Sequence, residues 1–71
     1  MNGRDALIAT HQQNDAELSR LVSEHRDLDD QLAAIESQRW LTAKEQARVK
    51  QMKRQKLQRR DRIDAILDRY R

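Results

Sequence analysis

The fold is decided by residues 18–35, which read LSRLVSEHRDLDDQLAAI. Apolar side chains recur there at steps of three and four, a spacing that only a helix produces and that is typical of a heptad seam. One step of the seam is filled by a histidine. The seam positions are Leu18, Leu21, His25, Leu28, Leu32 and Ile35. Residues 18–35 therefore predict a long amphipathic helix.

Toward the N-terminus the same seam becomes polar, because the frame passes through Asn14 and His11 before it reaches Leu7. Two helix starts fit this pattern. The helix begins near residue 5, or it begins at Asn14, which suits an N-cap with Glu17 three residues on. The second choice leaves residues 1–13 as a frayed arm. We favour the first, which gives a helix over about residues 5–37.

A second apolar stripe predicts another helix over about residues 43–70. Between Met52 and Ile63 the seam of this helix carries Lys and Arg side chains. Their aliphatic stems can cover apolar surface while their charged heads reach acids on a neighbouring helix. The stripe consists of Val49, Met52, Ile63, Ile66, Leu67 and Tyr70.

The two stripes are separated by residues 36–42, which read ESQRWLT and contain neither Gly nor Pro. Thr42 and Glu45 fit the capping box of a new helix start. The alternative is one unbroken helix of about 100 Å at 1.5 Å per residue, but it leaves Trp40 and Leu41 outside its seam. We favour a turn at about residues 38–42 within a single domain spanning residues 1–71.

The two halves of the chain carry opposite charge. Residues 1–36 hold three Lys/Arg against eight acids, net −5, and residues 37–71 hold twelve Lys/Arg against four acids, net +8. Opposite charge on stretches of similar length favours antiparallel packing. Folding about residues 39 and 40 places Met52 opposite Asp27 and Ile63 opposite Ala16. The expected fold is an all-α antiparallel helical hairpin.

Self-association is expected because a 71-residue chain without cysteine has only a marginal core. Two helices alone would leave much of both stripes in water. We expect a homo-oligomer, most simply a dimer, with a coiled-coil or four-helix-bundle arrangement. The predicted self-association seam comprises Leu18, Leu21, His25, Leu28, Leu32, Ile35, Val49, Met52, Ile63, Leu67 and Tyr70.

Catalysis is not expected from this sequence. The serines have no recognisable base or nucleophile elbow around them. His25 with Asp29 supplies only two metal ligands, so a seam histidine held by hydrogen bonds is the preferred interpretation. We therefore expect no enzyme activity, no cofactor and no metal.

Polyanion binding is the main alternative to a structural role, since the net charge is +3 and the pI about 9.8. Phosphate backbones of RNA, including ribosomal RNA, would attract the basic helix. Against this, the acidic first half can neutralise those charges within the molecule. The candidate polyanion contacts are Lys50, Lys53, Arg54, Lys56, Arg59, Arg60 and Arg62.

Trp40 and Leu41 lie at the expected tip, where they either cap the end of the bundle or contact an unknown protein partner. The longest apolar run is too short to span a bilayer. We therefore favour a non-enzymatic structural or protein-interaction module in the cytoplasm, with RNA or ribosome binding as the alternative.

Two motifs resemble the YdcH-like family of small bacterial proteins: EHRDLD at residues 24–29, followed by Leu32 and Ile35, and MKRQKLQRRDRI at residues 52–63. The family's second segment has the form Leu-Lys-x-x-Lys-Leu-x-x-Lys-Asp-x-Ile. Met52 stands here for its first Leu, Arg60 for its last Lys, and Arg59 for a position that is often apolar. The resemblance covers roughly residues 18–67. It implies a short helical hairpin or coiled coil in the bacterial cytoplasm, and it implies no activity.

Overall fold

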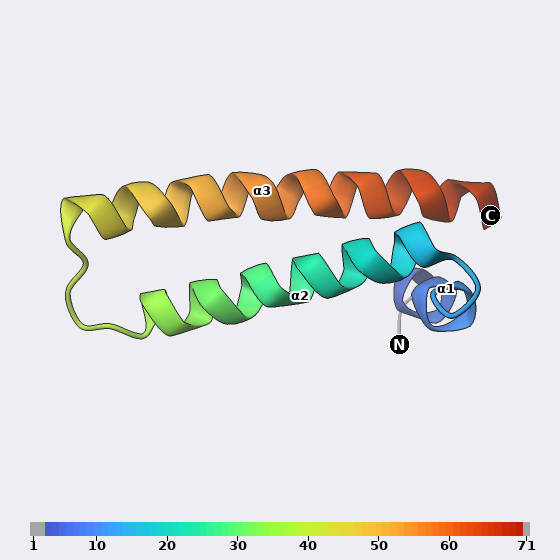
Figure 1. Cartoon of the computed structure of the whole chain (residues 1–71), viewed down its shortest axis with the longest axis horizontal. Coiled ribbons are helices and arrows are strands. Elements are labelled where there is room, and N and C mark those ends of the chain that lie inside the picture. The colour runs from blue at the N-terminus through green and yellow to red at the C-terminus, as the bar shows by residue number, and fades with distance from the viewer. Residues whose placement is uncertain (1–2, 71) are drawn as a thin grey trace.

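The computed structural model describes residues 3–70, which are helical apart from connections at 12–15 and 37–42. Helix α1 spans Gly3–His11, α2 spans Ala16–Glu36 and α3 spans Ala43–Leu67, and a 3₁₀ turn, η1, covers Asp68–Tyr70. The predicted all-α class is confirmed. Helices α2 and α3 lie side by side and run in opposite directions, and α1 lies across their other end, away from the connecting loop (Figure 1). The Cα atoms span 42 × 19 × 19 Å.

The expected continuous helix over residues 5–37 is divided into α1 and α2. Asp15, not Asn14, is the N-cap of α2: its backbone is extended, and its carboxylate accepts a 3.0 Å hydrogen bond from the backbone N–H of Leu18. A straight continuation would have carried the polar seam residues His11 and Asn14 past α3. The break instead turns α1 so that its apolar residues reach the core. Residues 3–11 are helical, and residues 1 and 2 of the alternative frayed arm lie outside the described residues.

The chain leaves α2 without glycine, and no described residue has a positive φ. Ser37 caps the C-terminus of α2, where its backbone N–H donates to the carbonyl of Ala33 and its hydroxyl to that of Ala34. The predicted capping box at the start of α3 is present. The Thr42 hydroxyl accepts from the N–H of Glu45, and the Glu45 carboxylate accepts from the N–H of Thr42, both at 3.1 Å. Side-chain caps thus satisfy both helix ends beside the loop.

Eight buried apolar side chains form two separate clusters along the α2–α3 contact. We call them the distal cluster, far from the loop, and the loop cluster. The distal cluster consists of Leu18, Leu21, Ile63, Ile66 and Leu67, with Leu7, Ile8 and Val22 packed against it. The loop cluster consists of Leu32, Val49 and Met52, with Leu28, Ile35 and Leu41 packed against it.

The expected register between the two long helices is wrong by about one helical turn. Met52 packs with Leu32 instead of lying opposite Asp27, and Ile63 packs with Leu18 and Leu21 instead of lying opposite Ala16. The reason is the path of the loop, which runs on beyond the end of α2 before α3 begins (Figure 1). The first turns of α3 therefore extend past α2, and every later residue of α3 is displaced along it.

Candidate functional site: the groove and the charged surfaces

The two apolar clusters are covered differently. Three helices enclose the distal cluster, because Leu7 and Ile8 of α1 pack on it and Arg4 Nε pairs with Asp64 Oδ1 at 2.7 Å. Among the described residues, only α2, α3 and Leu41 of the loop contribute to the loop cluster. The α2–α3 contact is thus a three-helix core at one end and a two-helix contact at the other.

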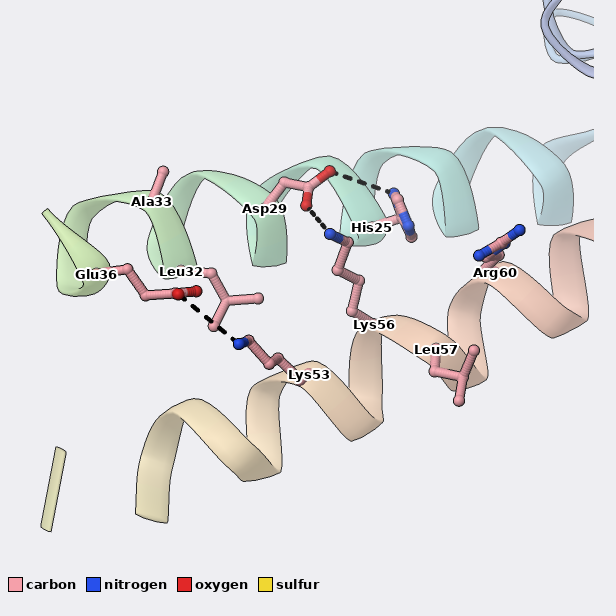
Figure 2. A pocket seen from close by; sticks show the side chains of 9 residues that line it. All are labelled: His25, Asp29, Leu32, Ala33, Glu36, Lys53, Lys56, Leu57 and Arg60. Atoms are coloured by element: carbon pink, nitrogen blue, oxygen red, sulfur yellow. Dashed lines mark ion pairs between the residues drawn. The ribbon is translucent and has the colours of Figure 1, made fainter. Parts of the chain in front are cut away.

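A groove lies between α2 and α3 in the part of the molecule that α1 does not cover. Its volume is about 450 Å³. Leu32 and Leu57 supply apolar surface, and Leu57 is 53% exposed. Figure 2 shows the side chains that line it, from both helices: His25, Asp29, Leu32, Ala33, Glu36, Lys53, Lys56, Leu57 and Arg60.

Ion pairs cross this groove from acids on α2 to bases on α3 (Figure 2). Lys56 Nζ pairs with Asp29 Oδ1, and Lys53 Nζ lies 3.7 Å from Glu36 Oε2. Arg60 is different, since it forms no ion pair within residues 3–70. The groove therefore carries an acidic side, a basic side and one arginine without an ion pair among the described residues.

His25 lies half-buried on the α2 side of the groove, with Nδ1 3.7 Å from Asp29 Oδ2. Burial lowers the pKa of His25, and the nearby cations Lys56, Arg4 and Arg60 lower it further, while Asp29 opposes them. The imidazole is accordingly neutral at pH 7. Its contact with Asp29 is a polar contact at that pH and not a salt bridge.

On the opposite flank of the α2–α3 contact, two further arginines are neutralised. Arg59 Nε pairs with Glu24 Oε2 at 3.1 Å, and Arg62 donates from Nε and Nη2 to Glu17 Oε1 at 2.9 and 2.6 Å. Four of the seven predicted polyanion contacts, Lys53, Lys56, Arg59 and Arg62, are thus in ion pairs within the chain. Lys50, Arg54 and Arg60 form none within the described residues.

The two predicted tip residues lie in different environments. Trp40 is 79% exposed, with the Arg39 guanidinium carbon 5.8 Å from its ring centroid. Leu41 is half-buried and packs on the loop cluster. Arg39, Lys44 and Arg48 share this end of the molecule and are not among the seven predicted polyanion contacts. They follow the last acid of α2, Glu36, and lie close in sequence to the only tryptophan, which is the signal that could have identified them.

Most of the predicted self-association seam is buried within the single chain. Seven positions are in its own core: Leu18, Leu21, Leu32, Val49, Met52, Ile63 and Leu67. His25, Leu28 and Ile35 are half-buried. Tyr70 is 39% exposed; its ring stacks on His11 at 3.9 Å between centroids. Of the seam positions that are not fully buried, His25 alone lines the groove, where the 53% exposed Leu57 adds apolar surface.

Within residues 3–70 no group of three or more His, Cys, Asp or Glu side chains is placed to hold a metal ion. In the same range, every buried side-chain nitrogen or oxygen has a hydrogen-bond partner. None of the described helices has the length and apolar character needed to cross a membrane.

An all-helical domain built on two long antiparallel helices is the class that the fold defines. The family described as "protein of unknown function (DUF465)" matches residues 18–67, which run from α2 to the end of α3. The chain belongs to this family, in agreement with the YdcH-like resemblance of its motifs. Helix α1 lies outside the matched residues. No curated protein and no solved structure matches the chain.

Proposed function

We propose that this chain is a non-enzymatic protein-interaction module, a helical hairpin that pairs with a second copy of itself through the α2–α3 groove. The observation that carries the proposal is the difference between the two clusters. A third helix covers the distal cluster, whereas the loop cluster is bordered by an open groove with an exposed leucine. A helix of a second copy in the groove would cover the loop cluster, as α1 covers the distal cluster.

Charge complementarity supports a second copy as the occupant. Arg60 on the α3 side of the groove forms no ion pair within residues 3–70, and neither does Asp30, an exposed residue of α2 that follows Asp29 but does not itself line the groove. Each copy therefore offers the other an acidic and a basic side chain that have no ion pair among the described residues of their own chain. Such pairs set orientation more than affinity. Two grooves facing one another across a two-fold axis would give a four-helix bundle, and two-fold dimers are the commonest homo-oligomers.

The dimensions of the molecule predict weak pairing. Half the 42 Å length of the molecule multiplied by its 19 Å width gives a contact area of about 400 Å² on each copy. The total, about 800 Å², lies below the size of a standard stable interface and in the range of transient ones. We expect a dimer that dissociates on dilution. The YdcH-like resemblance supports a setting in the bacterial cytoplasm.

Sedimentation equilibrium with two neighbouring alanines tests this proposal. Ala33 lines the groove, whereas Ala34, which is also exposed, does not. Between roughly 10 μM and 1 mM protein, we expect the native chain to shift from monomer to dimer. Ala33→Arg should weaken this association by about tenfold or more, and Ala34→Arg should leave it nearly unchanged. A monomer at every concentration, or equal effects of the two substitutions, would overturn the proposal.

A further inference from the structure

The positive charge that remains after internal pairing is concentrated at the loop end of the molecule. Residues 33–54 contain six Lys/Arg and two acids, net +4, so the rest of the chain is close to neutral. Both acids are occupied: Glu36 pairs with Lys53, and Glu45 accepts from Thr42 in the capping box. Five cations there form no ion pair within the described residues: Arg39, Lys44, Arg48, Lys50 and Arg54.

The path of the loop creates this concentration. Because α3 begins beyond the end of α2, its first turns have no acidic helix beside them (Figure 1). The later basic residues of α3, such as Lys56 and Arg59, do face acids of α2 and are neutralised. The loop end is therefore the part of the basic helix that carries most of its charge left unpaired within residues 3–70: Lys44, Arg48, Lys50 and Arg54, against Arg60 farther along.

An exposed aromatic ring lies in the same place. Trp40 is 79% exposed, and Arg39 lies over its ring at 5.8 Å from the centroid. A nucleobase can stack on an exposed tryptophan face, and base–aromatic stacking with neighbouring cations on phosphates is how sequence-tolerant single-strand binding works.

We propose that the loop end is a binding site for single-stranded polynucleotide, in which Trp40 stacks on a base while Arg39, Lys44 and Arg48 contact phosphates. Single strands fit better than duplex, because only an unstacked base can lie on the indole. A lipid surface fits less well, because Leu41 is packed into the loop cluster. That leaves Trp40 alone among the large apolar side chains of the loop to enter a bilayer interface.

This site is separate from the groove. Arg39, Trp40, Lys44 and Arg48 do not line the groove. A substitution that abolishes polynucleotide binding should therefore leave the pairing of two copies intact, and a substitution that abolishes pairing should leave polynucleotide binding intact.

Trp40 is the only tryptophan of the chain, so its fluorescence reports on this site alone. Titration with poly(U) or poly(dT) should quench it, and the two polymers distinguish RNA from DNA as the better ligand. Three phosphate contacts on a single strand give a salt slope of about −2, so a tenfold rise in salt should weaken binding about a hundredfold. Duplex DNA should bind more weakly than either single strand.

Substitutions at the loop end and away from it test where the polynucleotide binds. The double substitution Lys44→Gln, Arg48→Gln should lower the affinity at least tenfold. The matched control, Arg26→Gln with Arg69→Gln, removes the same charge from two arginines away from the loop end that form no ion pair within residues 3–70. It should have little effect. With a labelled oligonucleotide, Trp40→Ala should also lose about tenfold in affinity.

Three results would overturn the assignment. They are the absence of quenching by either polymer at low salt, equal losses in the loop-end and control variants, and a Trp40 response to vesicles containing phosphatidylserine but not to polynucleotide.

Discussion

The hydroxyl of Tyr70 donates a 2.8 Å hydrogen bond to Asp15 Oδ2, while the other oxygen of this carboxylate accepts from the backbone N–H of Leu18. One side chain near the C-terminus thus holds the residue that starts α2. The ring of Tyr70 also stacks on His11, the last residue of α1. Tyr70 therefore joins the end of α3 to the break between α1 and α2.

This contact predicts a change in two titrations. The N–H of Leu18 and then the hydroxyl of Tyr70 lower the pKa of Asp15, and the same hydrogen bond raises the pKa of Tyr70 above its ordinary value of 10.0. Tyr70→Phe keeps the ring but removes the donor, so the pKa of Asp15 should rise toward its ordinary value without reaching it. Carbon-detected NMR of the Asp15 carboxyl measures this. An unchanged pKa would mean that the bond is not formed in solution.

The same hydrogen bond makes part of the folding stability depend on pH in the alkaline range. Because the folded pKa of Tyr70 is raised, its contribution is fully present below the unfolded pKa and is lost as pH rises through the folded pKa. Between about pH 9 and pH 11 the native chain should therefore lose more stability toward urea than Tyr70→Phe does. Equal losses in the two proteins would contradict this expectation.

Mild acid should destabilise the chain through His25. Burial, with Lys56, Arg4 and Arg60, lowers the pKa of this residue against the opposing effect of Asp29. Its contribution is therefore present above its ordinary pKa and is lost as pH falls through the folded pKa. Urea unfolding between about pH 7.5 and pH 5 should show a decrease that is smaller in His25→Gln. The second histidine is present in both proteins and cancels in the comparison.

The cost in unfolding free energy of truncating a core side chain should differ between the distal cluster and the loop cluster. Leu18 is fully buried among three helices, whereas Leu32 lies beside the open groove. We expect Leu18→Ala to cost about 3–5 kcal/mol of unfolding free energy and Leu32→Ala about 2–3 kcal/mol, because the open site can relax more easily. Urea denaturation at a protein concentration where the chain is monomeric measures both. A larger cost at Leu32 would contradict the assignment of the main core to the distal cluster.

Loss of the capping box should destabilise α3. Thr42→Ala removes the hydroxyl that accepts from the N–H of Glu45 and should cost about 1 kcal/mol. Thr10→Ala is the matched control, because the Thr10 hydroxyl only donates to the carbonyl of Ala6 within α1. That substitution should change stability much less. Similar costs for both would show that the cap contributes little.

Part of this arrangement could be predicted from the sequence. Heptad spacing over residues 18–35 identified the helix that became α2, since the residues with this spacing lie on one face that contributes to both apolar clusters. The Thr42–Glu45 pair identified the start of α3, because a capping box is a local motif that depends on four consecutive residues. The first feature follows from the spacing of apolar residues along one helix, and the second from contacts between residues close in sequence.

The remaining features depend on contacts that are distant in sequence. The break before α2 occurs because Leu7 and Ile8 gain more by packing on the distal cluster than by continuing a polar seam. The shifted register follows from the path of the loop, and this path could not be predicted from the sequence. This shift determines which basic side chains of α3 face acidic side chains of α2. The candidate polyanion contacts could therefore be predicted from the sequence, but those in ion pairs, such as Lys56, could not be separated from those without one within residues 3–70, such as Lys50.

The most direct test of pairing through the groove is an NMR dilution series on the isotope-labelled native chain. If two copies pair as proposed, dilution from roughly 1 mM to roughly 10 μM should shift the resonances of Ala33, Leu57 and Arg60, which line the groove. Those of Ala34, Gln51 and Gln58, exposed and outside it, should stay in place. Spectra that do not change with concentration, or shifts spread evenly over both groups, would contradict the account.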